Sequence, residues 1–466
     1  MALCFVVESR CGTDAKIMCM TRRILWLVCS VLVTHGLAGC EQQTLLTAEQ
    51  LLNPDACQSC HPDHYQEWSG SMHAYASEDP VFRAMNARGQ EETDGELGDF
   101  CVQCHAPMAV AQGVTEDGLN LDELDAPMQG VTCAFCHLAN EVEGDHNAPI
   151  RLGTDGILLG GLADPVPTEA HKLAYSPLHD RNDLRSSTLC GSCHDIVTPR
   201  GVHLERTFAE WKESIFAQDT VFRLSCGNCH TRGRDGQAAD LEGLPIRRLH
   251  DHRMAGVDVA LTPFPDADNQ RLDVQRELDS TLASTICVAP FAGGSEVVVR
   301  LDNVGAGHSW PSGAAHDRRG WIEVTAWRGD EVLFQSGHVE EGVPITSIED
   351  PYLFLLRDKG FDENGEEAHM FWDIASVESN LLGTSVTLDP SDPAYYHYQE
   401  ARYPILGAVP DRVTSRVRLR PMGLEVIDDL IESGHLDPSI RANFPTFDLE
   451  STVLVWEGDV GDCVGP

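Results

Sequence analysis

Positive charge and long apolar runs are both scarce in this sequence of 466 residues. Lys and Arg number 33 against 73 Asp and Glu, so the formal net charge is −40 at pH 7. A surface this acidic repels nucleic acid and anionic lipid, which excludes both as partners. A solvated acidic surface explains the charge, and a cationic partner is the alternative. The apolar run at residues 24–33 is too short to cross a bilayer as a permanent helix.

The N-terminal segment, residues 1–40, has the features of an export signal. A basic pair precedes the apolar run, and Leu37-Ala-Gly-Cys40 follows it and resembles the lipobox of bacterial lipoproteins. By that resemblance, cleavage precedes Cys40 and Cys40 carries the lipid, so we expect an extracytoplasmic protein held at the outer membrane by a lipid anchor alone. An ordinary signal peptide with a chance cysteine is the alternative. The first residues lack signal character, so the true start is expected at Met18 or Met20.

The pattern Cys-x-x-Cys-His occurs five times between positions 57 and 230. The copies are motif 1 (Cys57-Gln-Ser-Cys60-His61), motif 2 (Cys101-Val-Gln-Cys104-His105), motif 3 (Cys133-Ala-Phe-Cys136-His137), motif 4 (Cys190-Gly-Ser-Cys193-His194) and motif 5 (Cys226-Gly-Asn-Cys229-His230). This pattern is the attachment signature of c-type haem. The two thiols can each form a thioether to one porphyrin, and the adjacent imidazole can reach its iron as the proximal ligand. The sequence therefore predicts five covalently bound haem c groups, each held by one motif.

Two cysteines remain once the motifs and the N-terminal segment are set aside. Of 17 Cys, ten belong to the motifs and five lie at or before Cys40, which leaves Cys287 and Cys463. Haem attachment to such motifs takes place outside the cytoplasm, where disulfides also persist. A Cys287–Cys463 disulfide is therefore predicted, provided that the two Cα atoms come within bridging distance.

Two stretches that follow motifs repeat each other. A helix is predicted at Pro62–Trp68 after motif 1, and a related stretch with a helix around Trp211 follows motif 4. Tyr65–Ser71 aligns without gaps with Phe208–Ser214, which suggests duplicated haem modules. Motif 1 with Pro62 and the phrase Glu67-Trp-Ser-Gly-Ser-Met-His73 resembles the multihaem family that includes the tetrahaem electron-acceptor cytochrome of ammonia oxidation and its c-prime-named relatives. The resemblance implies closely packed haems, in stacked or nearly perpendicular pairs, that pass electrons along a row. It covers the haem-binding region, and one haem in that family is five-coordinate.

Each iron needs a sixth ligand or keeps an open face. The resemblance favours His73 as a distal ligand, and positions near the motifs add His179, His203 and His252. The competitors are His171 and His146 for His179, His250 for His252, and Met254 as an alternative axial ligand. Ligation by two histidines gives low-spin iron whose coordination hardly changes on reduction, which suits electron transfer.

Beyond residue 258 the motifs cease and period-two apolar runs predict strands at Val297–Leu301, Trp321–Trp327, Val332–Gln335, Val413–Leu419 and Val453–Trp456. A hairpin turn is expected at Arg328-Gly-Asp330, and a helix over Leu424–Ile431 with Gly434 as its C-cap. The predicted fold is an α plus irregular multihaem domain wrapped around five c-type haems, followed by a mainly-β sandwich-like domain. The expected boundaries are a signal peptide at 1–40, a tether at 41–55, the pentahaem domain at 56–257, a linker at 258–285 and the sandwich-like domain at 286–466.

The segment 303–313 contains Gly307-His308-Ser-Trp-Pro-Ser-Gly313, which resembles the Gly-His-x-x-Pro-x-Gly segment of sandwich domains appended to multihaem cytochromes. A glycine-flanked imidazole can reach into a haem crevice, so His308 is expected to be a distal ligand supplied across the domain interface, with Arg318 and Arg319 near haem propionates. A loop histidine that closes a turn beside Trp310 is the alternative. Surface positions are expected for His316, His338, His369, His397 and His435.

These features favour a lipid-anchored electron carrier that connects envelope redox proteins or an extracytoplasmic acceptor and has no catalytic residue of its own. One alternative is a multihaem oxidoreductase of the nitrite or hydroxylamine class, which needs an open haem and nearby acid–base groups. The absence of a Cys-x-x-Cys-Lys motif argues against the lysine-ligated nitrite reductase pattern. A structural or docking subunit of a cytochrome assembly is the other alternative.

Overall fold

Each Cys-x-x-Cys-His motif lies on or next to a short helix in the computed structural model, which describes residues 45–465. The predicted signal segment, both alternative start sites and Cys40 lie outside these residues. Helix α8 (Cys133–Leu138) begins after Thr132 and α11 (Cys226–His230) after Ser225, and each of these hydroxyls accepts a backbone N–H of the first turn. Because residues three apart share a helix face, both thiols of a motif are brought to one side.

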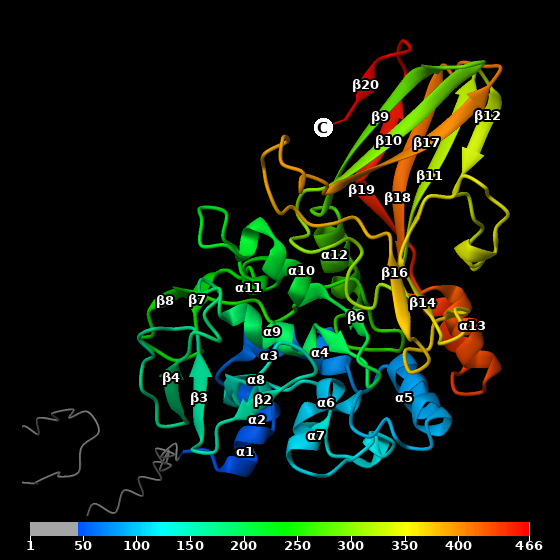
Figure 1. Ribbon diagram of the computed structural model, residues 1–466. Coiled ribbons are helices and arrows are strands. Elements are labelled where there is room, and N and C mark those ends of the chain that lie inside the picture. Colours follow the sequence, from blue (N-terminus) through cyan, green and yellow to red (C-terminus); the bar gives the residue numbers. More distant parts are fainter. Residues whose placement is uncertain (1–44, 466) are drawn as a thin grey trace, which may run out of the picture. The chain divides into compact units, whose positions relative to one another are not determined.

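The N-terminal part of the described chain is built from short helices, loops and two-stranded sheets (Figure 1). Besides α8 and α11, its α-helices are α1 (Ala48–Leu52), α2 (Asp55–Gln58), α3 (Pro62–Ser69), α4 (Met72–Tyr75), α5 (Pro80–Glu92), α6 (Val102–His105), α7 (Pro107–Ala111), α9 (Ser186–Cys193) and α10 (Thr207–Glu213). The 3-10 turns are η1 (Leu121–Glu123), η2 (Ala126–Met128) and η3 (Ile215–Ala217). The helices predicted after motif 1 and motif 4 are confirmed as α3 and α10.

Pairs of short strands connect these helices. They are β1 (Ala139–Val142) with β2 (Ile150–Leu152), β3 (Ile157–Gly160) with β4 (Lys172–Tyr175), β5 (Ile196–Val197) with β6 (His203–Glu205), and β7 (Asp235–Gln237) with β8 (Ile246–Arg248). The β3–β4 pair is parallel and the other three are antiparallel. These pairs hold the long connections between motifs in fixed positions. In the described residues, no helix is long and apolar enough to cross a membrane.

The segment expected to be a linker, residues 258–285, contains α12 (Ala267–Leu278) and the first residues of β9 (Leu282–Phe291). Helix α12 buries Val274 and Leu278 in the same hydrophobic core as the C-terminal strands. Its buried residues Gln270, Val274 and Leu278 are each four positions apart, the spacing of one helix face. Helix α12 therefore packs with the β-rich part of the chain.

Two antiparallel sheets form most of the C-terminal part, and their side chains share one core (Figure 1). The first sheet has the order β17 (Tyr398–Leu406), β10 (Gly294–Asn303), β9 and β20 (Cys463–Val464). The second has the order β12 (Glu331–Ser336), β11 (Arg319–Arg328), β18 (Arg412–Arg420) and β19 (Phe447–Trp456), with β13 (Leu355–Leu356) beside β11. A small sheet joins β15 (Glu367–Ala368), β14 (Asp358–Phe361) and β16 (Ser376–Ser379). This part is mostly β.

The strands read from the sequence are confirmed as β10, β11, β12, β18 and β19. Buried and half-exposed residues alternate along β9 and β10, as expected for strands with one face on a core. The turn at residues 328–330 joins β11 to β12, and Gly329 has a φ of 57° there. The predicted helix is α13 (Leu424–Glu432), and Gly434 follows it with a φ of 82°, the left-handed conformation common after helix ends. The remaining 3-10 turns are η4 (Ile345–Ser347) and η5 (Pro438–Asn443).

Cys287 of β9 lies opposite Cys463 of β20 in an antiparallel pair, and the two form a disulfide with Cα atoms 4.2 Å apart. Strand β20 has only two residues. The bond therefore fixes a short edge strand that has few backbone hydrogen bonds of its own.

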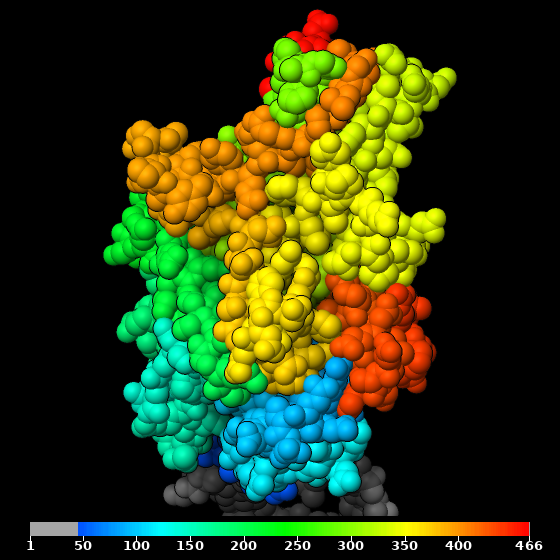
Figure 2. Space-filling view, turned by 45° about the vertical axis from the view of Figure 1, so that its right-hand side comes forward, coloured from blue at the N-terminus to red at the C-terminus, as the bar shows by residue number. Residues whose placement is uncertain are grey.

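Helix α5 from the N-terminal part packs against α13 from the C-terminal part. Val81 of α5 and Ile427 of α13 belong to one buried apolar cluster. Arg88 pairs with Asp429 at 2.7 Å across the same contact. In Figure 2 the blue surface of the residues around α5 adjoins the orange-red surface of α13. The N-terminal part and the β-rich part therefore share an apolar and ionic contact.

Candidate haem-binding centre

Four of the five motif histidines have the same contact between their Nδ1 atom and the backbone. These Nδ1 atoms lie within hydrogen-bond distance of backbone carbonyls: His61 with Ala238 at 2.7 Å, His105 with Ala76 at 3.0 Å, His137 with Leu159 at 2.6 Å and His230 with Ala255 at 2.8 Å. A donated Nδ1–H fixes the tautomer and leaves Nε2 bare as a metal ligand. This is the orientation that an axial haem ligand requires.

Three motif histidines face a second imidazole across a gap. The ring centres are 6.2 Å apart for His61 and His171, 6.2 Å for His194 and His73, and 6.4 Å for His137 and His252. A metal bonded at about 2 Å to the Nε2 atom of a ring on each side holds the two ring centres about 6 Å apart. The spacing of these pairs therefore fits an iron between two axial histidines. Two of these motif histidines have another imidazole nearby as well: the ring centre of His64 lies 6.0 Å from that of His61, and the ring centre of His179 lies 5.7 Å from that of His137.

His252 and His308 have the same hydrogen-bond arrangement as the motif histidines. The Nδ1 atom of His252 lies 3.1 Å from the carbonyl oxygen of His250, and that of His308 lies 2.8 Å from the carbonyl oxygen of Ser309. Burial, together with the nearby charges of His230 and Arg318, lowers the pKa of His308 to about 4. His308 is half-buried and lies near motif 5, although it comes from the loop before β11.

Burial also keeps the facing imidazoles neutral. It lowers the pKa of His73 and of His194 to about 4, and that of His137 to about 3. Neighbouring histidines contribute to each shift. A neutral imidazole is the form that binds a metal, so these sites do not have to lose a proton at neutral pH.

Two of the predicted distal candidates do not face a motif histidine through a free Nε2 atom. The Nε2 of His179 lies 2.7 Å from the carbonyl oxygen of Cys136, so the nitrogen that would bind iron is already engaged. His203 is exposed, and its ring lies 6.4 Å from that of His146. His171, which the sequence offers as the alternative to His179, has its ring 6.2 Å from that of His61 in motif 1.

Motif 2 has different surroundings. The ring of Phe82 from α5 stacks on that of His105 with centres 4.0 Å apart and planes 2° from parallel. Within residues 45–465, no second imidazole is paired with His105 in the way that His171 is paired with His61. For motif 2, the described residues therefore offer no histidine as a distal ligand.

Cysteines of different motifs lie side by side. Side-chain hydrogen bonding lowers the pKa of Cys57, Cys193 and Cys226 and raises that of their respective neighbours Cys133, Cys104 and Cys190. Burial raises the pKa of Cys136 to about 12, and nearby Cys193 adds to the shift. Motif 1 therefore adjoins motif 3, motif 3 adjoins motif 4, and motif 4 adjoins both motif 2 and motif 5.

The surface positions expected for two C-terminal histidines are wrong. His316 is 6% exposed and His397 is 7% exposed. His316 lies beside Asp317, and the ring of His397 packs edge-on against Tyr395 with centres 4.5 Å apart. His338 is exposed as expected, while His369 and His435 are half-buried.

The two arginines expected near propionates have different surroundings. Arg318 pairs with Asp258 at 3.1 Å, and its charge lowers the pKa of both His194 and His308, so it lies close to motif 4. Arg319 is buried and donates to Glu425 of α13 at 2.6 Å. The expectation for Arg319 is therefore corrected, because its guanidinium is engaged inside the C-terminal part.

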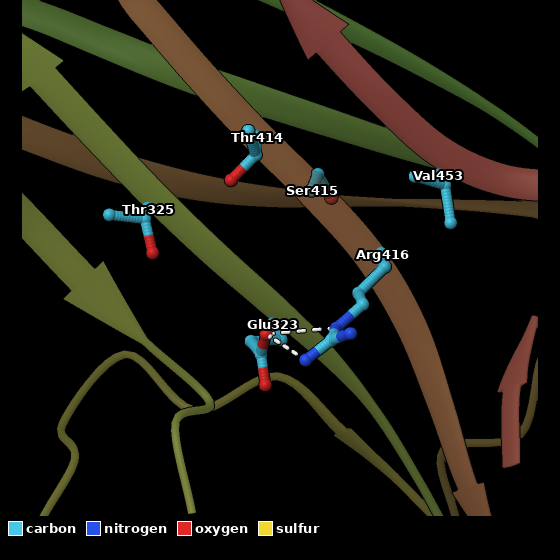
Figure 3. Close-up of a pocket in the computed structure, with 6 residues that line it drawn as sticks. All are labelled: Glu323, Thr325, Thr414, Ser415, Arg416 and Val453. Carbon is cyan, nitrogen blue, oxygen red and sulfur yellow. Dashed lines mark hydrogen bonds and ion pairs between the residues drawn. The ribbon is translucent and has the colours of Figure 1, made fainter.

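A surface hollow lies on the second sheet. Its lining residues are far from the motifs in the sequence. It is lined by residues of β11, β18 and β19: Glu323, Thr325, Thr414, Ser415, Arg416 and Val453 (Figure 3). Arg416 pairs with Glu323 there at 2.6 Å. Its lining contains neither cysteine nor histidine, so it offers none of the ligands that haem attachment needs.

Comparisons with known proteins agree with this reading. Residues 56–138, which include motifs 1 to 3, match the family described as cytochrome c554 and c-prime. The fold is similar to the crystal structure of a penta-heme cytochrome c552 from Thermochromatium tepidum, with a TM-score of 0.58, 20% sequence identity, and 88% of this chain and 98% of that chain covered. Comparison with curated proteins finds no matching sequence. The two matches support a multihaem c-type cytochrome with an electron-transfer kind of function and covalently bound haem c.

Proposed function

We propose that this protein is an electron carrier that holds five haem c groups, one on each motif. The observation that carries the proposal is the spacing of the facing imidazoles, 6.2–6.4 Å between ring centres at three motif histidines. Bound haem c supplies an iron that changes its oxidation state by one electron while its axial ligands stay in place. The two cysteines of each motif form the thioethers, and His61, His105, His137, His194 and His230 are the proximal ligands.

The distal ligands follow from the pairs. His171 serves motif 1, His252 serves motif 3, and His73 serves motif 4. His308 serves motif 5, because it lies near His230 and its Nδ1 lies within hydrogen-bond distance of a backbone carbonyl, as the Nδ1 of His230 does. This last ligand comes from the β-rich part, which thereby acts as a rigid support for one haem site.

The neighbour relations of the motifs define a route. Motif 1 adjoins motif 3, which adjoins motif 4, and motif 4 adjoins motifs 2 and 5. Electrons that enter at motif 1 or motif 3 reach motif 4 and can leave through either of its other neighbours. The side chains hold the five sites in one continuous group, which is what a carrier between two partners requires.

The partners are other redox proteins or an extracytoplasmic acceptor. Haem attachment outside the cytoplasm and the Cys287–Cys463 disulfide both fit an oxidising compartment. The lipobox-like sequence supports a lipid anchor on Cys40 and a place at the outer membrane.

A second function, an oxidoreductase of the nitrite or hydroxylamine class, is favoured by one specific observation. Among the described residues, the one ring paired with His105 of motif 2 is Phe82, which stacks on the imidazole itself, and no second imidazole is paired with it, so one haem of the five would keep an open face. Such a site could bind a small ligand that the other four would exclude.

The visible spectrum of the dithionite-reduced protein, before and after addition of carbon monoxide, tests the proposal. Mass spectrometry of the same sample should show five covalently attached haems. We expect carbon monoxide to shift the Soret band of about one haem, the one on motif 2. A shift from several haems would contradict the proposed distal ligands, and fewer than five attached haems would contradict the cofactor count. Turnover of nitrite or hydroxylamine by the reduced protein would favour the second function.

A further inference from the structure

The repeated stretches after motif 1 and motif 4 make equivalent contacts in the fold. The indole nitrogen of Trp68 in α3 donates to the carbonyl of Val131 at 2.8 Å. The indole nitrogen of Trp211 in α10 donates to the carbonyl of Leu224 at 2.9 Å. Each acceptor lies two residues before the first cysteine of another motif, motif 3 in the first case and motif 5 in the second. Each Trp therefore fixes the approach to a motif helix.

A backbone bond strengthens each of these contacts in the same way. The N–H of Val131 donates to the carbonyl of His73 at 2.8 Å, and the N–H of Leu224 donates to the carbonyl of Phe216 at 2.9 Å. His73 and Phe216 stand at the same position of the repeat, five residues after the respective Trp. The residue before each motif's N-cap is thus held by both its N–H and its carbonyl.

The glutamate before each Trp reaches toward a proposed distal ligand. Glu67 accepts the backbone N–H of His252 at 3.1 Å. Glu210 accepts the backbone N–H of Ser309, next to His308, at 3.1 Å, and also the hydroxyl of Ser312 at 2.7 Å. The two distal segments have no sequence similarity, yet each is held at its backbone by the same position of the repeat.

We propose that each Glu-Trp pair positions both axial sides of a single haem site. Trp68 sets the proximal motif 3 and Glu67 sets its distal ligand His252. Trp211 sets the proximal motif 5 and Glu210 sets its distal ligand His308. The inference rests on the ligand set proposed above and assigns Glu67 and Glu210 as positioning residues for it. A partly buried backbone N–H that loses its acceptor is left unpaired, which costs free energy. Removal of either carboxylate therefore loosens the distal segment.

The test compares Glu210→Ala and Glu67→Ala with the exposed neighbours on the same helices, Glu213→Ala and Gln66→Ala, as matched controls. His308→Ala and His252→Ala serve as references that remove the ligand itself. We expect each Glu→Ala variant to keep five attached haems and to gain up to about one carbon monoxide-reactive haem. The control variants should match the unaltered protein. Glu210→Gln and Glu67→Gln should restore the original spectrum, since an amide oxygen can accept the same backbone N–H.

The outcomes separate this inference from the proposed function. If the His variants open a haem and the Glu→Ala variants do not, the positioning role is overturned while the ligands stand. If the His variants also leave the spectrum unchanged, the ligand set falls and the positioning role with it. Where a Glu→Ala variant does not mature, Glu→Asp at the same position, which shortens the reach to the backbone N–H, takes its place. Additional carbon monoxide binding at up to about one haem supports the inference, and an unchanged carbon monoxide-bound spectrum overturns it.

Discussion

The ring of His73, in α4, faces that of His194 at the end of α9 with 6.2 Å between the ring centres. Burial keeps both imidazoles neutral, since it lowers the pKa of each to about 4. Two neutral rings at this spacing form a ready pair of axial ligands. The pair brings the segment after motif 1 beside motif 4, so in the ligand set proposed above the two repeated stretches meet at one haem site.

His73→Ala should open the site on motif 4. We expect the reduced variant to bind carbon monoxide at about one more haem than the unaltered protein, because the iron loses its distal ligand. The control is His203→Ala, which removes an exposed ring that pairs with His146 instead of a motif histidine. Equal carbon monoxide binding by the two variants would contradict the assignment of His73.

His171 and His179 give opposite predictions at motif 1. His171→Ala should expose one further iron to carbon monoxide, because the ring of His171 faces that of His61 at 6.2 Å. His179→Ala should leave the carbon monoxide-bound spectrum unchanged, because the Nε2 atom of His179 is engaged by the carbonyl of Cys136. The reverse result would assign His179 as the ligand and would displace His171.

The positions of the motifs could be predicted from the sequence because covalent attachment to one porphyrin requires a fixed spacing of cysteines and histidine. Strands such as β18 could be predicted because Val417 and Leu419 alternate with Arg416 and Arg418, a period of two. The distal ligands depend on which distant loops pack against each motif. The periodicity of apolar residues carries no information about such long-range contacts. The N–H of Leu46 donates to the carbonyl of Ala170 at 2.8 Å, which brings the segment with His171 beside the chain that leads into motif 1.

The sequence also does not predict which single polar residues in loops are buried. His316 lies outside any strand or helix, and neither its neighbours nor a periodic pattern indicates that it is covered. The repeat in the sequence places Glu67 and Glu210 at the same position, which indicates only that the two glutamates are equivalent. The sequence did not reveal their acceptor role, since the two distal segments share no pattern.

Replacement of both Cys287 and Cys463 by serine should destabilise the β-rich part. The cross-link spans a separation of 176 residues, and loss of such a bond lowers the free energy of unfolding by about 2–4 kcal/mol. The measurement is denaturant unfolding followed by far-ultraviolet circular dichroism. The visible spectrum should stay as it is, because neither cysteine belongs to a motif. A changed haem spectrum in a folded variant would show that the bond also supports the haem sites.

The ion pair of Asp429 with Arg88 should make the contact of α13 with α5 sensitive to acid. Asp429 accepts from Arg88 at 2.7 Å and from His369 at 2.8 Å. Burial opposes the ionised form, but these two partners outweigh it and lower the pKa of Asp429. A carboxylate with a lowered pKa contributes stability above its ordinary pKa, and this contribution is lost as the pH falls through the lowered value.

Asp429→Asn should therefore reduce the free energy of unfolding by about 1 kcal/mol at pH 7. The difference from the unaltered protein should shrink as the pH falls below about 4, where the unfolded carboxyl begins to take up its proton. Denaturant unfolding at a series of pH values measures both effects, with Glu432→Gln, an exposed acid on the same helix, as the control. A difference that is constant from pH 7 to pH 3 would mean that Asp429 acts through packing, and the ionic account of this contact would then fail.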